Sequence, residues 1–382
     1  MRNIMLCSLV VVLIAAVPIR AGVINPDISV VGQPSLRMTD DNEEPNTKRL
    51  RLDAGETEFM FDSYLNPYAR GSFILSLAEE GLELEEGYFT ILRGLPGGLN
   101  LKGGKYRTGF GKLNLAHPHA NPFAEPFRVL STYLPGEESY NETGISLSER
   151  IPMPGDFSLT VSVDVLQGDT FRRSREADSA SLAVGDPLNQ YAGGPDRSGE
   201  TRLAVLGRLS AFTMVAERSG IEFGVSATQG TNNVAAGART RVYGADVKAK
   251  LWNSPRSYLL LQGEALKLDR QDTSWDPETA RYIKDKASPF GGYFFADYNF
   301  ALRYNVGASY ERYQTDEADK TWNQAAGLFA GFALMEETTA IRADWSHFAP
   351  GKPEGADESP KAVNTFTLRV IYSMGPHKAH QF

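Results

Sequence analysis

Several stretches of the chain alternate apolar and polar residues with a period of two, and this alternation constrains the fold more than any other feature of the sequence. In residues 158–165, four aliphatic side chains alternate with Ser, Thr, Ser and Asp. The same alternation recurs in residues 221–228, 302–311, 341–346 and 366–374. Successive side chains of a β-strand point to opposite faces, so each stretch predicts a strand with one apolar and one polar face.

The breaks between the predicted strands alternate in length. Short joints with the residues of tight turns lie at 65–68, 95–98, 152–156, 253–256 and 335–338. Longer polar stretches lie at 114–143, 170–201, 271–289 and 350–362. Short turns at one end and long loops at the other are typical of membrane barrels and not of soluble sandwiches. The sequence therefore predicts an all-β protein, a transmembrane antiparallel closed β-barrel of about 16 strands (about 14–18).

The first 21 residues have the pattern of a secretory signal peptide. Arg2 precedes an apolar run over residues 5–17, and a small-residue exit ends at Ala21. We therefore expect residues 1–21 to be removed on export and residues 22–382 to form one barrel domain in the outer membrane of a Gram-negative bacterium. Cys7 is the only cysteine, so the exported chain would have neither a disulfide nor a thiolate.

Charge and hydropathy exclude two classes of protein. The formal net charge of −8 argues against nucleic acid as a partner, because phosphate binding requires a basic face. After the signal peptide, no apolar stretch reaches the ~20 residues of a membrane-spanning helix. An enzyme is not expected either, because the sequence has no Gly-x-Ser-x-Gly elbow and no convergent acid, base and nucleophile. No cofactor is predicted.

Three segments of the N-terminal third, residues 25–32, 66–70 and 83–88, resemble a group of porin-like bacterial outer-membrane barrels whose members are mostly uncharacterised. Residues 99–111 also resemble a strand of the phosphate-selective porin O and P family. The resemblance covers residues 25–145 and is only architectural beyond them. It implies a passive or selective pore and supplies no catalytic residue.

Some members of this group are loosely labelled TonB-dependent receptors. Such receptors carry an N-terminal plug domain inside a barrel of ~22 strands. Only a few residues separate Ala21 from the first predicted strand, so we expect no plug domain here.

A run of basic residues gives the candidates for a pore constriction: Lys102, Lys105, Arg107, Lys112 and Arg128. Regular alternation cannot turn all of them to the lumen unless one of the neighbouring glycines hosts a bulge. The functional interpretation is a cationic constriction that attracts anions. The alternative is that these charges anchor the interface and balance Glu83, Glu85 and Glu86 of the preceding strand.

Residues 114–143 form the longest apolar loop candidate, with four prolines and several aromatic residues. Loops of this length are usually functional or disordered, and the apolar content argues against disorder. We expect this segment to fold inward and narrow the pore, the alternative being an ordinary outside loop. His117 and His119 lie within it and are the histidines to consider for a metal. No metal site is predicted, because the sequence lacks further ligands at fixed spacing.

Alternation also gives a set of lumen-facing candidates with mixed signs, which would make any ion selectivity weak: Asp164, Glu222, Glu264, Arg303, Glu311, Arg342, Asp344 and Arg369. The leading functional hypothesis is a channel for the diffusion of small polar or anionic solutes. The alternatives are a ligand-specific uptake barrel and a closed structural barrel without transport. The expected partners are the solute, outer-membrane lipid and the barrel-assembly machinery, and a homo-oligomer is compatible with this fold.

Overall fold

The computed structural model describes residues 26–375, without 45–46, 80, 137–138, 173–199, 201, 277, 280, 316–320, 336–338 and 354. The predicted signal peptide, residues 1–21, and the C-terminal residues 376–382 lie outside the described residues. Most of the predicted loop at 170–201 also lies outside them.

The strand segments are β1 (Asp27–Gly32), β2 (Ser35–Thr39), β3 (Arg51–Asp53), β4 (Thr57–Asn66), β5 (Ala69–Ala78), β6 (Gly81–Ile91), β7 (Asn100–Arg107), β8 (Asn141–Pro152), β9 (Phe157–Leu166), β10 (Ala204–Ala216), β11 (Ser219–Asn233), β12 (Ala238–Ser254), β13 (Ser257–Asp276), β14 (Arg281–Ala287), β15 (Phe290–Phe300), β16 (Tyr304–Gln314), β17 (Trp322–Met335), β18 (Thr339–Ala349) and β19 (Val363–Met374). The helical segments are η1 (Pro96–Gly98), η2 (Leu113–Leu115), η3 (Pro118–Ala120), α1 (Arg128–Tyr133) and η4 (Asp169–Phe171). Within the described ranges, no helix has the length and apolar character needed to cross a membrane.

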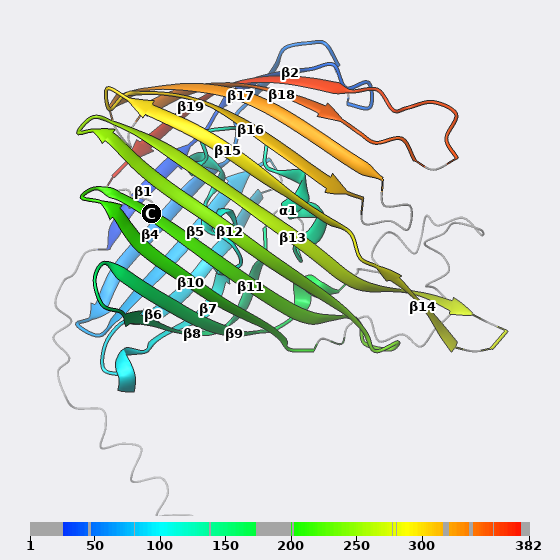
Figure 1. The fold of residues 1–382 in the computed structure, drawn as a ribbon, viewed down its shortest axis with the longest axis horizontal. Helices are drawn as coiled ribbons and strands as arrows, with labels where there is room; N and C mark the ends of the chain where they lie inside the picture. The colour runs from blue at the N-terminus through cyan, green and yellow to red at the C-terminus, as the bar shows by residue number, and fades with distance from the viewer. Residues whose placement is uncertain are drawn as a thin grey trace, which may run out of the picture.

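All of these strand segments belong to one antiparallel sheet that closes on itself (Figure 1). Closure comes from the last segment, β19, which pairs with both β1 and β2. β1 continues into β2, β3 into β4, and β14 into β15, so the nineteen described segments make sixteen strands. The predicted closed barrel of about sixteen strands is confirmed. Closure leaves no unpaired edge, which a sheet in lipid requires.

The two faces of the wall have opposite chemistry, as β11 illustrates. Phe223 and Val225 are 56% and 54% exposed on the outside, whereas Glu222, at 9%, and Ser226 are buried on the inside. A soluble protein would place these apolar side chains in its core. The alternation that predicts the strands is therefore realised with the apolar face outward, as a barrel in lipid requires.

The two ends of the barrel also differ. One end carries short connections such as Asn66 to Ala69 and Ser254 to Ser257, and the other carries the long connection from β7 to β8. The predicted loop at 271–289 is wrong in part, because β13 and β14 pair from Arg270 to Asp276 and extend the wall as a hairpin. This hairpin projects beyond the rim in Figure 1. Most of its residues are polar, so no regular apolar face marks this stretch as a strand in the sequence.

Candidate functional site

The connection between β7 and β8 folds inside the barrel, and we call residues 109–136 the inner segment. It contains η2, η3 and α1, and α1 contacts β13, β15 and β16 from within (Figure 1). The observed connection is 108–140, whereas the sequence suggested 114–143. The boundaries differ because β7 ends at Arg107 and Asn141 already pairs with it as the start of β8.

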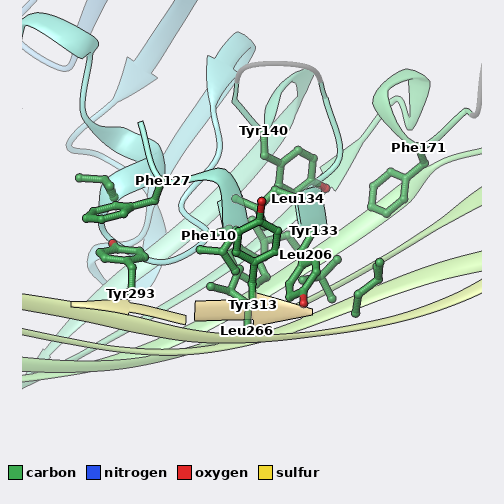
Figure 2. Packing of buried hydrophobic residues seen from close by; sticks show 14 of the residues in the cluster. Phe110, Phe127, Tyr133, Leu134, Tyr140, Phe171, Leu206, Leu266, Tyr293 and Tyr313 are labelled. Atoms are coloured by element: carbon green, nitrogen blue, oxygen red, sulfur yellow. The ribbon is translucent and has the colours of Figure 1, made fainter. Parts of the chain in front are cut away.

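Aromatic side chains pack the middle of the inner segment against the wall (Figure 2). The ring of Phe127 stacks on Tyr293 of β15 at 4.0 Å between centroids and 14° between planes. Phe123 meets Phe295 of β15 at 5.2 Å, and Tyr133 of α1 meets Tyr313 of β16 at 6.5 Å. Burial of such rings away from water stabilises this position of the segment.

Carboxylates of the wall accept hydrogen bonds from main-chain N–H groups of the inner segment. Oε1 of Glu264, on β13, accepts from the amides of Lys112 and Leu113 at 2.7 and 2.9 Å. Glu311, on β16, accepts from the amide of Val129 at 3.1 Å. Asp344, on β18, accepts from the amide of Ala124 at 3.2 Å.

Arginines of the wall make the complementary contacts to main-chain carbonyls. Arg369, on β19, donates to the carbonyl oxygens of Pro118, Asn121 and Phe123 at 3.1, 3.1 and 2.9 Å. Arg342, on β18, donates to the carbonyl of His119 at 2.9 Å and also to that of Asn121. Loop carbonyls and amides buried without partners would be costly, so these side chains hold one defined backbone path.

Six of the eight lumen-facing candidates therefore contact the inner segment. Besides the five just described, Glu222 forms an ion pair with Lys112 at 2.6 Å. Asp164 accepts a hydrogen bond from the hydroxyl of Tyr106 on β7 at 2.9 Å. Arg303 is an exception, since it lies exposed in the turn before β16 and not in the lumen wall. The backbone at Ala301 and Leu302 has positive φ, and these residues turn the chain between Phe300, the end of β15, and its partner Tyr304, the start of β16.

The five basic constriction candidates have different partners. Lys112 pairs with Glu222, and Arg128 lies 3.7 Å from Glu311 and over the ring of Phe348. Arg107 pairs with Glu85. Lys102 lies over the rings of Tyr88 and Tyr106, and Lys105 is half-buried and donates to the carbonyl of Leu84. The described structure therefore shows these cations in separate contacts, most of them balanced by a carboxylate.

No bulge lies at Gly103 or Gly104 of β7, so alternation does not turn all of the basic side chains to one face, and a bulge lies instead on the neighbouring strand β6. Pairing of β7 with β6 and with β8 is continuous, but the register of β5 with β6 shifts so that Glu85 is the extra residue. A bulge turns neighbouring side chains toward the same face. Glu85 and Glu86 consequently both reach groups of the inner segment.

These two carboxylates form a cluster with Glu58 of β4 and the histidines of the inner segment, and we call Glu58, Glu85, Glu86, His117 and His119 the His–Glu cluster. Nε2 of His117 donates to Glu86 at 2.8 Å. Nδ1 of His119 donates to Glu58 at 2.9 Å. Nδ1 of His117 lies 3.1 Å from Oε2 of Glu58 and 3.3 Å from Oε2 of Glu85.

The electrostatics of the cluster favour a positive charge on the inner segment. Burial by itself lowers the pKa of His117, but the close carboxylates of Glu58, Glu85 and Glu86 outweigh it and raise that pKa well above its ordinary range. Glu58, Glu85 and His117 have the ligand atoms and the proximity to hold a metal ion. His347 is not part of the cluster, because its ring bonds Asn364 on the neighbouring strand.

Sequence reasoning missed Glu58 and the aromatic partners Tyr293 and Phe295. Glu58 is separated from His117 by 59 positions, so no local spacing signals their contact. One signal was present for Glu85 and Glu86, since two adjacent acids interrupt the alternation of their strand. Such an interruption in an otherwise regular barrel strand indicates a bulge.

Comparisons with known proteins agree with this architecture. No protein-family model matches the chain. An uncharacterized protein of Aquifex aeolicus (strain VF5) is 28% identical over 340 residues, which cover 84% of this chain and 67% of that protein.

Solved structures share the fold at low sequence identity. The anion-selective porin from Comamonas acidovorans has a TM-score of 0.59 at 10% identity, covering 92% of this chain and 99% of the porin. A loop-deletion mutant of OmpT, an outer membrane protein of Vibrio cholerae, has a TM-score of 0.56 at 9% identity, covering 92% and 99%. The outer membrane channel DcaP of Acinetobacter baumannii has a TM-score of 0.54 at 11% identity, covering 92% and 98%. The chain therefore has the fold of bacterial outer-membrane porins.

Proposed function

We propose that this chain is an outer-membrane channel through which small polar or anionic solutes diffuse, narrowed by the inner segment. One observation carries the proposal: charged side chains of the lumen wall bind the backbone of the inner segment. They do so inside a barrel whose outer face is apolar. Glu264 and Arg369 illustrate it, because Glu264 accepts from a main-chain N–H of the inner segment and Arg369 donates to one of its carbonyls. A segment held in this way sets a fixed constriction in a polar passage.

The anionic part of the proposal rests on further basic side chains of the lumen wall. Arg150 on β8 and Lys248 on β12 share the face that carries buried polar residues. The similarity in fold to an anion-selective porin is consistent with this preference. The phosphate-selective resemblance of residues 99–111 remains a prediction, as do the signal peptide, the lipid and assembly-machinery partners and a homo-oligomer.

Liposome swelling tests the passage of solutes directly. Vesicles with the refolded chain should swell in solutions of small neutral and anionic solutes, at a rate that falls steeply with solute size. Vesicles with heat-denatured protein are the control. Saturation of the rate with one solute would favour a ligand-specific uptake barrel instead.

A closed structural barrel is the second candidate, and the aromatic packing favours it. Phe123 and Phe127 fill part of the lumen against Tyr293 and Phe295. Folded, inserted protein that allows no swelling with any solute would support this candidate and overturn the channel.

A further inference from the structure

Three buried polar atoms of the His–Glu cluster face one another without hydrogen-bond geometry. They are Oε2 of Glu58, Oε2 of Glu85 and Nδ1 of His117. All three lie within 4.8 Å of one another. Glu58 is 1% exposed and His117 7%, so water does not solvate these atoms freely. Buried polar atoms nearly always have a hydrogen-bond partner or a bound ion, so these three atoms indicate a binding site.

The second ring nitrogen of His117 fixes which chemistry Nδ1 can offer. Nε2 donates its proton to Glu86 at 2.8 Å, which leaves a lone pair on Nδ1 in the neutral ring. In the charged ring that position holds a proton, and a divalent ion lying between Nδ1 and the two carboxylate oxygens, 3.1 and 3.3 Å away, would take the place of that proton. A carboxylate that orients a histidine through its other nitrogen is the usual support of a metal ligand.

We propose that Glu58, Glu85 and His117 bind a divalent transition-metal ion of the zinc class. The distances from Nδ1 to the two oxygens, 3.1 and 3.3 Å, fit ligands that share one ion, because ligand bonds of about 2.0–2.2 Å place neighbouring ligand atoms about 3 Å apart. One imidazole with two carboxylates suits Zn²⁺ better than Ca²⁺, which prefers six or more oxygens.

Charge and outer contacts agree with a divalent ion. Glu58, Glu85 and Glu86 bring three negative charges, and Arg107 returns one positive charge through Glu85. The remaining two would be balanced by one divalent cation, which reduces the cost of burying them. The main-chain amide of Arg107 also donates to Glu86 at 3.1 Å.

The ion would join the inner segment to two strands of the wall. Glu58 lies on β4, Glu85 on β6 and His117 next to η3. A shared ligand set would therefore hold the inner segment at a point that precedes its aromatic contacts in the sequence. The bulge at Glu85 contributes to this ligand set, because it turns the carboxylate toward His117. This inference does not depend on whether solutes pass the barrel.

Isothermal titration of the refolded full chain with Zn²⁺ tests the site. His377→Gln and His380→Gln are introduced into every sample to remove the tail histidines. We expect one Zn²⁺ per chain, unchanged binding in the matched control His347→Gln, and unmeasurable binding in His117→Gln. Glu86→Gln should weaken binding by about 10–100-fold, as expected for an orienting partner.

Three results would overturn the proposal: no saturable Zn²⁺ binding, equal binding by His117→Gln, or a Ca²⁺ affinity as high as that for Zn²⁺. Barrel folding of each variant is checked by circular dichroism and heat-modifiable migration in gels. If His117→Gln does not fold, Cu²⁺ is added instead to a variant in which His347, His377 and His380 are all replaced by Gln, so that His117 and His119 are the remaining histidines. Pulsed electron paramagnetic resonance should then show one coordinated imidazole, and the absence of imidazole modulation would refute the site.

Discussion

Gly111 lies directly against the carboxylate of Glu264. A β-carbon at Gly111 would be 2.3 Å from Oε2 of Glu264, and the residue has a φ of +63°. Both facts favour glycine at this position, since other residues rarely adopt positive φ and the space is already taken. The carboxylate is in turn fixed by the amides of Lys112 and Leu113. The entry of the inner segment into the lumen therefore depends on one small residue and one wall acid.

Gly111→Ala should loosen this contact. The positive φ alone costs about 1–2 kcal/mol, and the overlap with Glu264 adds to it. We expect faster proteolysis of the inner segment and noisier single-channel current. Gly109→Ala is the matched control, because a β-carbon there meets no atom within 4 Å. Equal effects of the two substitutions would contradict the proposed role of Glu264.

Arg369→Met should release the carbonyls of Pro118, Asn121 and Phe123. Hydrogen bonds to a charged group contribute about 1.5–3 kcal/mol each, so the inner segment should lose much of its anchorage. We expect a larger mean conductance and more open-channel noise, measured in planar bilayers. Arg303→Met, in an exposed turn, should leave both unchanged. A wild-type current trace from Arg369→Met would show that the segment is held by other contacts.

Val225→Arg tests the depth of the wall in the membrane. Val225 lies outward near the middle of β11, and Val215 lies outward one residue before the end of β10. An arginine at the bilayer midplane costs about 2–4 kcal/mol, falling to about 0–1 near the interface. Denaturant unfolding in lipid vesicles should therefore show a clearly lower free energy of unfolding for Val225→Arg and little change for Val215→Arg. Similar small losses for both would contradict a membrane-spanning β11.

Much of the wall is predictable because its signal is local. The alternation around Glu222 and Asp164 identifies both the strand and the face, since the side-chain period of a strand is two. The same rule places Arg369, Asp344 and Glu311 on the inside, where the structure has them. It fails for Arg303, whose position depends on two residues with positive φ that the sequence does not mark.

The contacts of the inner segment could not be predicted in the same way. His117 meets Glu58 of β4 and Glu85 of β6 only because the inner segment folds back against these strands and a bulge lies at Glu85. The basic residues Arg107 and Lys112 looked like an anion-attracting group because their acidic partners lie on other strands. Strand register, which decides such pairs, is a property of the whole sheet.

Single-channel recording of the wild-type chain in planar bilayers under a salt gradient tests the central claim most directly. We expect discrete current steps with a reversal potential near zero or of the sign that indicates anion selectivity, because most lumen charges are paired. Correctly folded and inserted protein that gives no current steps would contradict a channel. A reversal potential with strong cation preference would contradict the anionic part of the proposal.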